Sequence, residues 1–171
     1  MNRQDAQDAK LPEPDRELDQ VARDVADAAL EVHRILGPGL LESVYEQALS
    51  VELGLRCVRV ARQVPVAVTY KNVAIGEARL DLLVADRLIV ELKACPSLLP
   101  IHLAQVLSYL KASDRSLGLL INFNVPLLST TAPNLLWLDF CARRVRTQGA
   151  RPKEYSLSFE VSQRSERARL V

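Results

Sequence analysis

The sequence predicts an α/β fold in which a mixed central β-sheet is flanked by helices. Two amphipathic segments come first, a three-stranded antiparallel meander occupies the middle, and a helix followed by a short apolar strand comes next. A strand that follows a crossover helix can run parallel to the strand before that helix, which makes the sheet mixed. The 171 residues, 49% of them hydrophobic, suffice for one domain with a substantial core.

The first two predicted elements are helices. From about Asp15 to Leu36 apolar residues recur at helical spacing, and Gly37-Pro38-Gly39 ends this helix. A second helix is predicted from about Leu41 to Leu53. Glu42 lies at its start, where the helix dipole favours a carboxylate. Alternatively, Glu42 reaches toward the charged residues of the meander.

The meander carries the most informative side chains. Its first strand is predicted within residues 57–70, with Val64–Tyr70 as the alternating part, and the next two at Val73–Val84 and Leu88–Ala94. Turns at residues 71–72 and 85–87 join the three strands. If Val84 pairs with Leu88, side-chain alternation sets Asp81 opposite Glu91, and Lys93 emerges on the same face.

These three charged residues lie within otherwise apolar strands, where burial is costly unless the charges are paired or bind a metal. Two close carboxylates suit Mg²⁺ or Mn²⁺. A neighbouring lysine can orient a water or stabilise negative charge on a phosphoryl group. The alternative is a structural salt bridge between Lys93 and Asp81 or Glu91, and the spacing alone leaves both interpretations open.

A further helix, Ile101–Ala112, and an apolar strand, Ser116–Phe123, follow the meander. His102, Gln105 and Tyr109 share one face of that helix. Gln105 and Tyr109 either satisfy backbone groups or hold a substrate phosphate or a water at the metal, whereas a lone His102 is more typical of a satisfied surface or core histidine. Two later stretches look strand-like, namely Leu135–Phe140 and Tyr155–Val161.

The predicted organisation is a flexible leader (1–15), a core domain (16–124), a C-terminal extension packed on or near it (125–161) and a disordered tail (162–171). The net charge is only +1, but residues 141–171 hold eight basic and three acidic side chains, and this segment either contacts a nucleic-acid backbone or is solvated. Three separated cysteines indicate neither a zinc site nor a disulfide framework.

No apolar run approaches the roughly 18–20 residues of a membrane span, and the first residues lack the apolar region of a signal peptide. We therefore expect a cytoplasmic protein without a membrane partner. The oligomeric state is not readable from the sequence.

Several motifs, in order, resemble the GxxExxY protein family. The naming signature is matched by Gly39-Leu40-Leu41-Glu42-Ser43-Val44-Tyr45, and its flanks are matched by residues 31–39, 62–66, 89–94 and 118–123. Asp81…Glu91-x-Lys93 looks like the core of a PD-(D/E)xK nuclease, although Leu80 replaces the proline. Gln105…Tyr109 resembles the QxxxY motif of the RecB-like and lambda-exonuclease-like branch. The resemblance covers roughly residues 17–124.

This resemblance implies a restriction-endonuclease-like core with a divalent metal, Mg²⁺ or Mn²⁺, at its active site. The implied metal ligands are Asp81, Glu91 and the carbonyl of Leu92, with Glu42 as an additional acid from the preceding helix. Lys93 would be the catalytic lysine, and Gln105 and Tyr109 the supporting polar pair.

The expected function is therefore that of a divalent-metal-dependent nuclease, a hydrolase of nucleic-acid phosphodiester bonds, with DNA as the expected substrate. The alternative is a catalytically inactive nuclease-fold module that binds nucleic acid or protein. The choice between DNA and RNA, and between exonuclease and endonuclease action, depends on the exposed surface rather than on these motifs.

Overall fold

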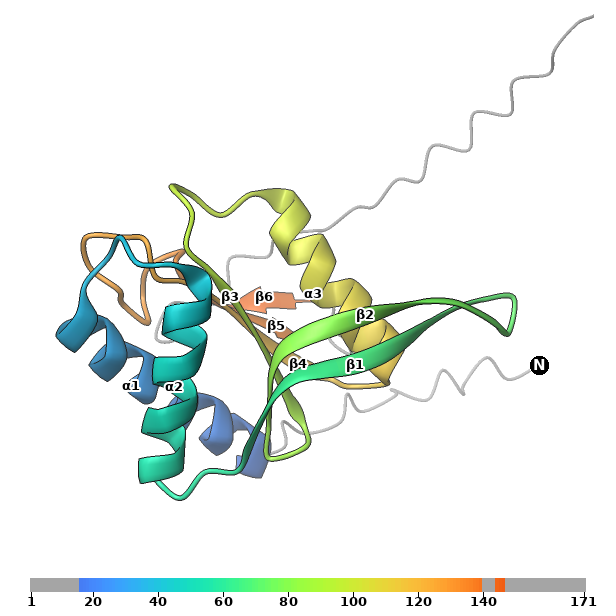
Figure 1. Ribbon diagram of the computed structural model, residues 1–171, viewed down its shortest axis with the longest axis horizontal. Coiled ribbons are helices and arrows are strands. Elements are labelled where there is room, and N and C mark those ends of the chain that lie inside the picture. The colour runs from blue at the N-terminus through green and yellow to red at the C-terminus, as the bar shows by residue number, and fades with distance from the viewer. Residues whose placement is uncertain (1–15, 140–143, 147–171) are drawn as a thin grey trace, which may run out of the picture.

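Figure 1 shows the computed structural model, which describes residues 16–139 and 144–146. The predictions for the leader, for the Tyr155–Val161 strand, for the tail and for most of the basic C-terminal segment lie outside these residues. The elements along the chain are α1 (Arg16–Leu36), α2 (Glu42–Leu55), β1 (Val60–Tyr70), β2 (Val73–Val84), β3 (Leu88–Lys93), α3 (Pro100–Ser113), β4 (Leu117–Asn122), β5 (Leu135–Asp139) and β6 (Arg144–Arg146).

One mixed sheet holds these strands in the order β1-β2-β3-β4-β5-β6. Neighbouring strands are antiparallel except β3 and β4, which are parallel and joined through α3. The predicted meander followed by a strand after a crossover helix is confirmed. Strand β5 adds to the same sheet near its predicted position, whereas the short strand β6 was not predicted.

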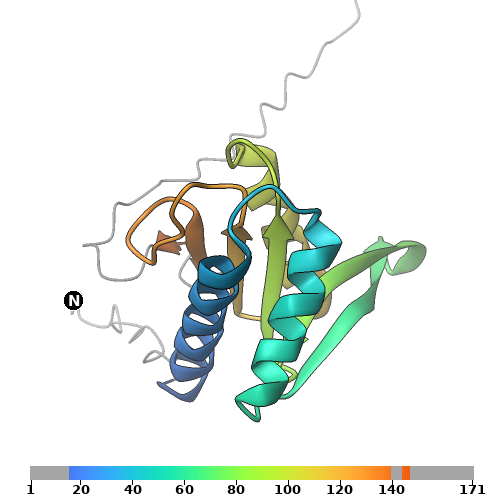
Figure 2. The same cartoon turned by 60° about the vertical axis from the view of Figure 1, so that its left-hand side comes forward.

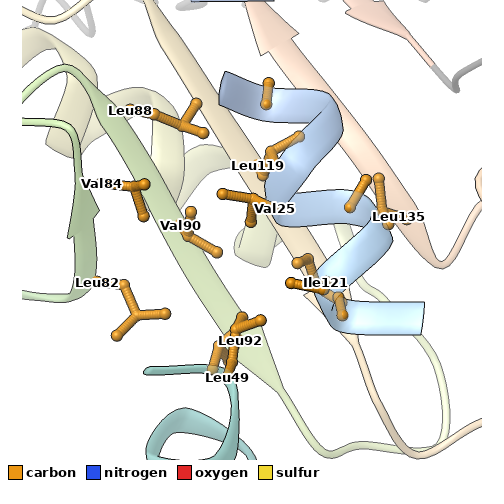
Figure 3. Packing of buried hydrophobic residues seen from close by; sticks show 14 of the residues in the cluster. Val25, Leu49, Leu82, Val84, Leu88, Val90, Leu92, Leu119, Ile121 and Leu135 are labelled. Atoms are coloured by element: carbon orange, nitrogen blue, oxygen red, sulfur yellow. The ribbon is translucent and has the colours of Figure 1, made fainter. Parts of the chain in front are cut away.

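Two layers of helices cover the sheet: α1 and α2 lie on one face and α3 on the other (Figures 1 and 2). On the α1/α2 side, Val25 and Leu49 pack against alternate residues of the central strands (Figure 3). These central residues are Leu88, Val90 and Leu92 of β3 and Leu117, Leu119 and Ile121 of β4. On the α3 side, Val106 and Leu110 pack against Ile89 and Leu120. Because both faces are covered, β3 and β4 are apolar nearly throughout.

The β1–β2 hairpin changes sides along its length. Leu82 packs in the core on the α1/α2 side, but Leu80, two residues earlier, packs in the core on the α3 side. Strict alternation would place both on one face. The hairpin therefore twists between Leu80 and Leu82. In the paired strand β1, Gln63 lies between their partners and adopts a left-handed φ of 52°. Asp81 lies at this twist.

The turn between α1 and α2 depends on glycine and tyrosine. Gly39 has a φ of +99°, a backbone conformation that residues other than glycine rarely adopt. The Tyr45 hydroxyl donates a hydrogen bond to the Gly37 carbonyl at 2.7 Å and accepts one from the Leu40 N–H at 3.1 Å. The Tyr45 ring stacks on Phe123 with centroids 4.5 Å apart. Gly39 and Tyr45 of the motif thus shape this turn, and they bring Glu42 to the start of α2.

Element boundaries differ from the predictions where tertiary contacts extend an element. Strand β1 begins at Val60, within the predicted range and four residues before its alternating part, because Val60 pairs with Val84. Helix α3 begins at Pro100, a residue suited to a first helical turn because it has no N–H to leave unpaired. Among the described residues, no helix is long and apolar enough to cross a bilayer.

Candidate active site where β2 and β3 separate

Asp81 lies where the pairing of β2 with β3 ends. The register Val84↔Leu88, Leu83↔Ile89 and Leu82↔Val90 is the one the sequence predicted, and continuing it by one residue sets Asp81 across from Glu91. The backbone pairing ends at Leu82 and Val90. Next to it, the Asp81 side chain contacts β3 directly, because its Oδ2 accepts a hydrogen bond from the Leu92 N–H at 2.8 Å. This contact fixes the half-buried carboxylate against β3.

Glu91 is a buried carboxylate that is only half satisfied. Its residue is 2% exposed, and its Oε1 accepts a hydrogen bond from Lys93 Nζ at 2.7 Å. Its Oε2 is buried and has no hydrogen-bond partner. The salt bridge that the sequence left as an alternative is therefore formed, but it compensates one oxygen of Glu91 and leaves the other without a partner.

The electrostatics of the site reflect an excess of negative charge. Burial, together with the neighbouring Asp81 charge, raises the pKa of Glu91 to about 7, although Lys93 opposes the shift. Burial also raises the pKa of Asp81, against the hydrogen bond from Leu92. Burial lowers the pKa of Lys93, but the bond to Glu91 and the surrounding carboxylates outweigh it and raise that pKa overall. The site thus favours a bound cation or a bound proton.

Helix α2 adds negative charge from the side. The Glu42 charge raises the pKa of both Asp81 and Glu91, so the acid predicted on this helix does lie near the β2–β3 carboxylates. Glu46, one turn later, is buried and also acts on Asp81. Its two oxygens accept hydrogen bonds from Arg62 Nε at 2.8 Å and from Gln63 Nε2 at 2.7 Å.

Sequence reasoning did not select Glu46. The available signal was its spacing of four residues from Glu42, which places both acids on one face of α2. Arg62 and Gln63 begin the stretch 62–66, which resembles a flanking motif of the GxxExxY family but was given no role. In the structure these two residues bind Glu46 at the twist of the hairpin, beside Asp81 in the adjacent strand.

Asn122 is a second residue that the sequence analysis did not single out. It is fully buried at the end of β4, where its Nδ2 donates a hydrogen bond to the Cys95 carbonyl at 2.8 Å. Its Oδ1 accepts from the N–H groups of Cys95 and Asn124, each at 3.2 Å. Asn122 therefore holds the chain that follows Lys93 in place.

The polar residues of α3 behave differently. Gln105 Nε2 donates a hydrogen bond to the Tyr109 hydroxyl at 2.8 Å. Within the part of the chain that the structure describes, no hydrogen bond joins this pair to Asp81, Glu91 or Lys93. His102 Nδ1 accepts from the Leu99 N–H at 3.1 Å and so closes the start of the helix.

The donor set fits a hard divalent cation that keeps some of its waters. In residues 16–139 and 144–146, no three His, Cys, Asp or Glu side chains are grouped closely enough to hold a metal by themselves. A cation here would combine two carboxylates with backbone carbonyl and water oxygens, as Mg²⁺ commonly does. The buried Glu91 Oε2 without a partner is the atom that such a cation would satisfy.

Comparison with known proteins agrees with this architecture. The family model of the PD-(D/E)XK nuclease superfamily matches residues 19–132, which is well over half of the chain. Searches of curated proteins and of solved structures gave no significant match. The matched range contains all but the first three residues of α1, the whole of α2, the meander with its three charged residues, and the crossover to β4. The chain therefore belongs to the PD-(D/E)XK nuclease superfamily.

Proposed function

We propose that this protein is a divalent-metal-dependent nuclease that hydrolyses phosphodiester bonds, with DNA as its substrate and Mg²⁺ or Mn²⁺ as its cofactor. Nucleases of this superfamily generally use divalent metals. The observation that carries the proposal is the buried Glu91, which has one oxygen paired with Lys93 and the other without a partner beside the Asp81 carboxylate. Within the superfamily, the motif from Gly39 to Tyr45 supports assignment to the GxxExxY family, and Gln105…Tyr109 supports the RecB-like branch.

The proposed ligands of the metal are the carboxylates of Asp81 and Glu91 and the carbonyl of Leu92, with Glu42 as the additional acid from α2. The bound cation would supply Lewis-acid polarisation of the phosphate. The Leu92 N–H holds Asp81 for this role through its Oδ2, and Oδ1 is the oxygen that this hydrogen bond does not use. Asn122 binds both backbone groups of Cys95, two residues after Lys93, and so anchors the chain where it leaves β3.

Lys93 is the proposed catalytic lysine. Because its pKa is raised, its Nζ keeps three protons at neutral pH and acts as a cationic hydrogen-bond donor. It can therefore stabilise negative charge that develops on a phosphoryl oxygen and can orient a water through its remaining protons. Glu91 positions the ammonium through the 2.7 Å contact.

Gln105 and Tyr109 are the proposed supporting pair. Gln105 donates to the Tyr109 oxygen, which leaves the hydroxyl proton of Tyr109 available for a phosphate oxygen of the substrate. Both side chains are half-buried, so a substrate that lies against α3 can reach them.

A second candidate is an inactive nuclease-fold module that binds nucleic acid or protein. The Lys93–Glu91 ion pair favours it, because an ammonium already compensates part of the charge that a metal would otherwise neutralise. The absence of a three-side-chain metal cluster among the described residues points the same way. A module of this kind need not bind Mn²⁺.

A cleavage assay separates the two candidates. Linear, circular and single-stranded DNA, and RNA of matched length, are incubated with the wild-type protein and Mg²⁺ or Mn²⁺, with and without chelator. We expect chelator-sensitive cleavage, and for Glu91→Gln and Lys93→Ala a loss of at least about 100-fold, the scale for removing one group that stabilises the transition state. Circular dichroism checks that both variants fold. Wild-type cleavage rates in Glu91→Gln would refute the proposed site.

A further inference from the structure

Helix α2 has an apolar surface on its solvent side as well as on its core side. Tyr45, Leu49 and Leu53 are buried against the sheet. A second row of apolar residues, spaced three and four residues apart, runs from the residue before the helix to its last residue. We call this row the α2 stripe, and it consists of Leu41, Val44, Ala48, Val51 and Leu55.

The α2 stripe is exposed in the described structure. Leu41 and Leu55 at its two ends are 74% and 75% exposed, and Val44 and Val51 are exposed as well. Ala48 at its centre is half-buried. In Figure 2, α2 stands beside α1 on the outer side of the sheet, and none of the described elements lies over its outward face.

The order of side chains in the α2 stripe is the same in both directions: Leu, Val, Ala, Val, Leu. If two copies of α2 cross in antiparallel orientation at Ala48, each Leu41 meets the partner's Leu55 and each Val44 meets the partner's Val51. A two-fold dimer requires such a self-complementary patch. The small Ala48 at the crossing point allows the two helix backbones to approach closely.

The surroundings of the α2 stripe also fit an interface. The stripe contains no charged residue, while Gln47 lies along one side and the Glu52–Arg56 ion pair, with 2.7 Å between Oε1 and Nε, lies along the other. An apolar centre with a polar rim is the usual arrangement of a protein interface. Leu40, next to Leu41 in the chain, and Ile35 and Leu36 at the end of α1 are further exposed apolar residues.

The apolar residues on and around the α2 stripe are largely exposed. Ile35, Leu41, Val51 and Leu55 each expose more than half of their surface, and Leu36, Leu40 and Val44 expose about two fifths. Each partner of a standard interface contributes about 800 Å², arranged as an apolar centre within a polar rim. In a dimer the α2 stripe would form the apolar centre, and the polar residues beside it would form the rim.

We propose that the α2 stripe is a homodimer interface in which a second copy of this chain packs against it across a two-fold axis at Ala48. The opposite side of α2 carries Glu42 and Glu46 toward Asp81, so the dimer would hold two candidate active sites on either side of one helix pair. The dimer does not depend on catalysis, and Glu91→Gln must dimerise as the wild type does. Failure of one proposal is therefore distinguishable from failure of the other.

Sedimentation velocity of the full chain, from low to high micromolar concentration, tests the interface. We expect a wild-type dimer, and a monomer at every concentration for Val44→Asp and Val51→Asp. The matched control is Ile75→Asp on β2: Ile75 is 63% exposed, against 53% for Val51, but lies outside the stripe, so this variant must remain dimeric. Because all three side chains are exposed, the far-UV circular dichroism spectrum of each variant should be unchanged and should confirm that it folds. The thermal midpoint of the two stripe variants should instead fall and lose its dependence on protein concentration, because a dimer is stabilised by its own association.

Oxidative cross-linking tests the position of the axis. A cysteine introduced by Ala48→Cys lies next to its own copy in the proposed dimer, and we expect a 48–48 disulfide that peptide mass spectrometry distinguishes from bonds of the native cysteines. The control Lys111→Cys on α3 should give no 111–111 disulfide. A monomeric wild type overturns the proposal. A dimer that persists in Val51→Asp also overturns it. So does a protein that dimerises only after residues 147–171 are deleted, because the stripe would then be covered by the end of its own chain.

Discussion

Helices α2 and α3 were both predicted to contribute polar residues to one site, but their contacts with its carboxylates differ. The charge of Glu42 on α2 raises the pKa of Asp81 and Glu91, and Glu46 binds the twisted part of the hairpin beside Asp81. On α3, Gln105 and Tyr109 bind each other and have no hydrogen bond to the carboxylates among the described residues. Residues that share a helix face thus need not share contacts. Helix α2 thus contributes charge at the two carboxylates, whereas the α3 pair makes no hydrogen bond to them within the described part of the chain.

The largest expected difference between substitutions on α2 and on α3 is in how the free energy of unfolding depends on pH. Glu91 has a pKa of about 7 in the folded protein, against an ordinary value of 4.5, so between these pH values the folded state binds more protons than the unfolded state. Without metal, the free energy of unfolding should therefore fall as pH rises from 4.5 through 7, by up to about 3 kcal/mol at 1.36 kcal/mol per pKa unit.

Urea unfolding at a series of pH values in chelator measures this fall. Glu42→Gln removes one of the charges that raise the Glu91 pKa, so this variant should show a smaller fall. Gln105→Ala on α3 should show the same fall as the wild type. If Gln105→Ala reduced the fall as much as Glu42→Gln does, the contrast between the two helices would be lost.

A smaller effect is expected from the hydrogen bonds of Glu46. Glu46→Ala removes the acceptor of Arg62 Nε and of Gln63 Nε2 at the twist of the hairpin, whereas Arg62 keeps its hydrogen bond to Gln47. Arg62 is partly exposed, so solvent compensates some of the loss, and we expect a destabilisation of about 2 kcal/mol. The matched change on α3, Gln105→Ala, removes one half-buried contact and should cost less than about 1 kcal/mol. Denaturant midpoints compare the two, and equal costs would contradict the anchoring role of Glu46.

The smallest effect concerns two tyrosines. Tyr45→Phe removes a hydroxyl that bonds both the Gly37 carbonyl and the Leu40 N–H, which should cost about 1 kcal/mol or slightly more. Tyr109→Phe removes a half-buried hydroxyl with one partner and should cost less. Thermal unfolding of both variants gives the order, and a larger loss for Tyr109→Phe would reverse it.

The sequence was sufficient for the order of elements and for the Val84–Leu88 register, because alternation and turn residues are local properties of the chain. It was insufficient for Glu46, since the partners Arg62 and Gln63 come from a different element and the contact depends on a twist that breaks alternation at Leu80. The role of Asn122 was likewise hidden, because a buried amide that binds the chain after β3 leaves no periodic signal. Strand β6 is only three residues long and exists through its pairing with β5.

The central claim is that Glu91 and Asp81 together hold a divalent cation, and direct Mn²⁺ binding tests it without requiring a substrate. Isothermal titration of the full chain with Mn²⁺ at pH 7 should show a bound ion and release of protons, because Glu91 is partly protonated there and must lose its proton to bind metal. Glu91→Gln, shown to be folded by circular dichroism, should bind Mn²⁺ at least about tenfold more weakly, a loss of about 1.4 kcal/mol. Equal Mn²⁺ affinity in the wild type and in Glu91→Gln would contradict the claim.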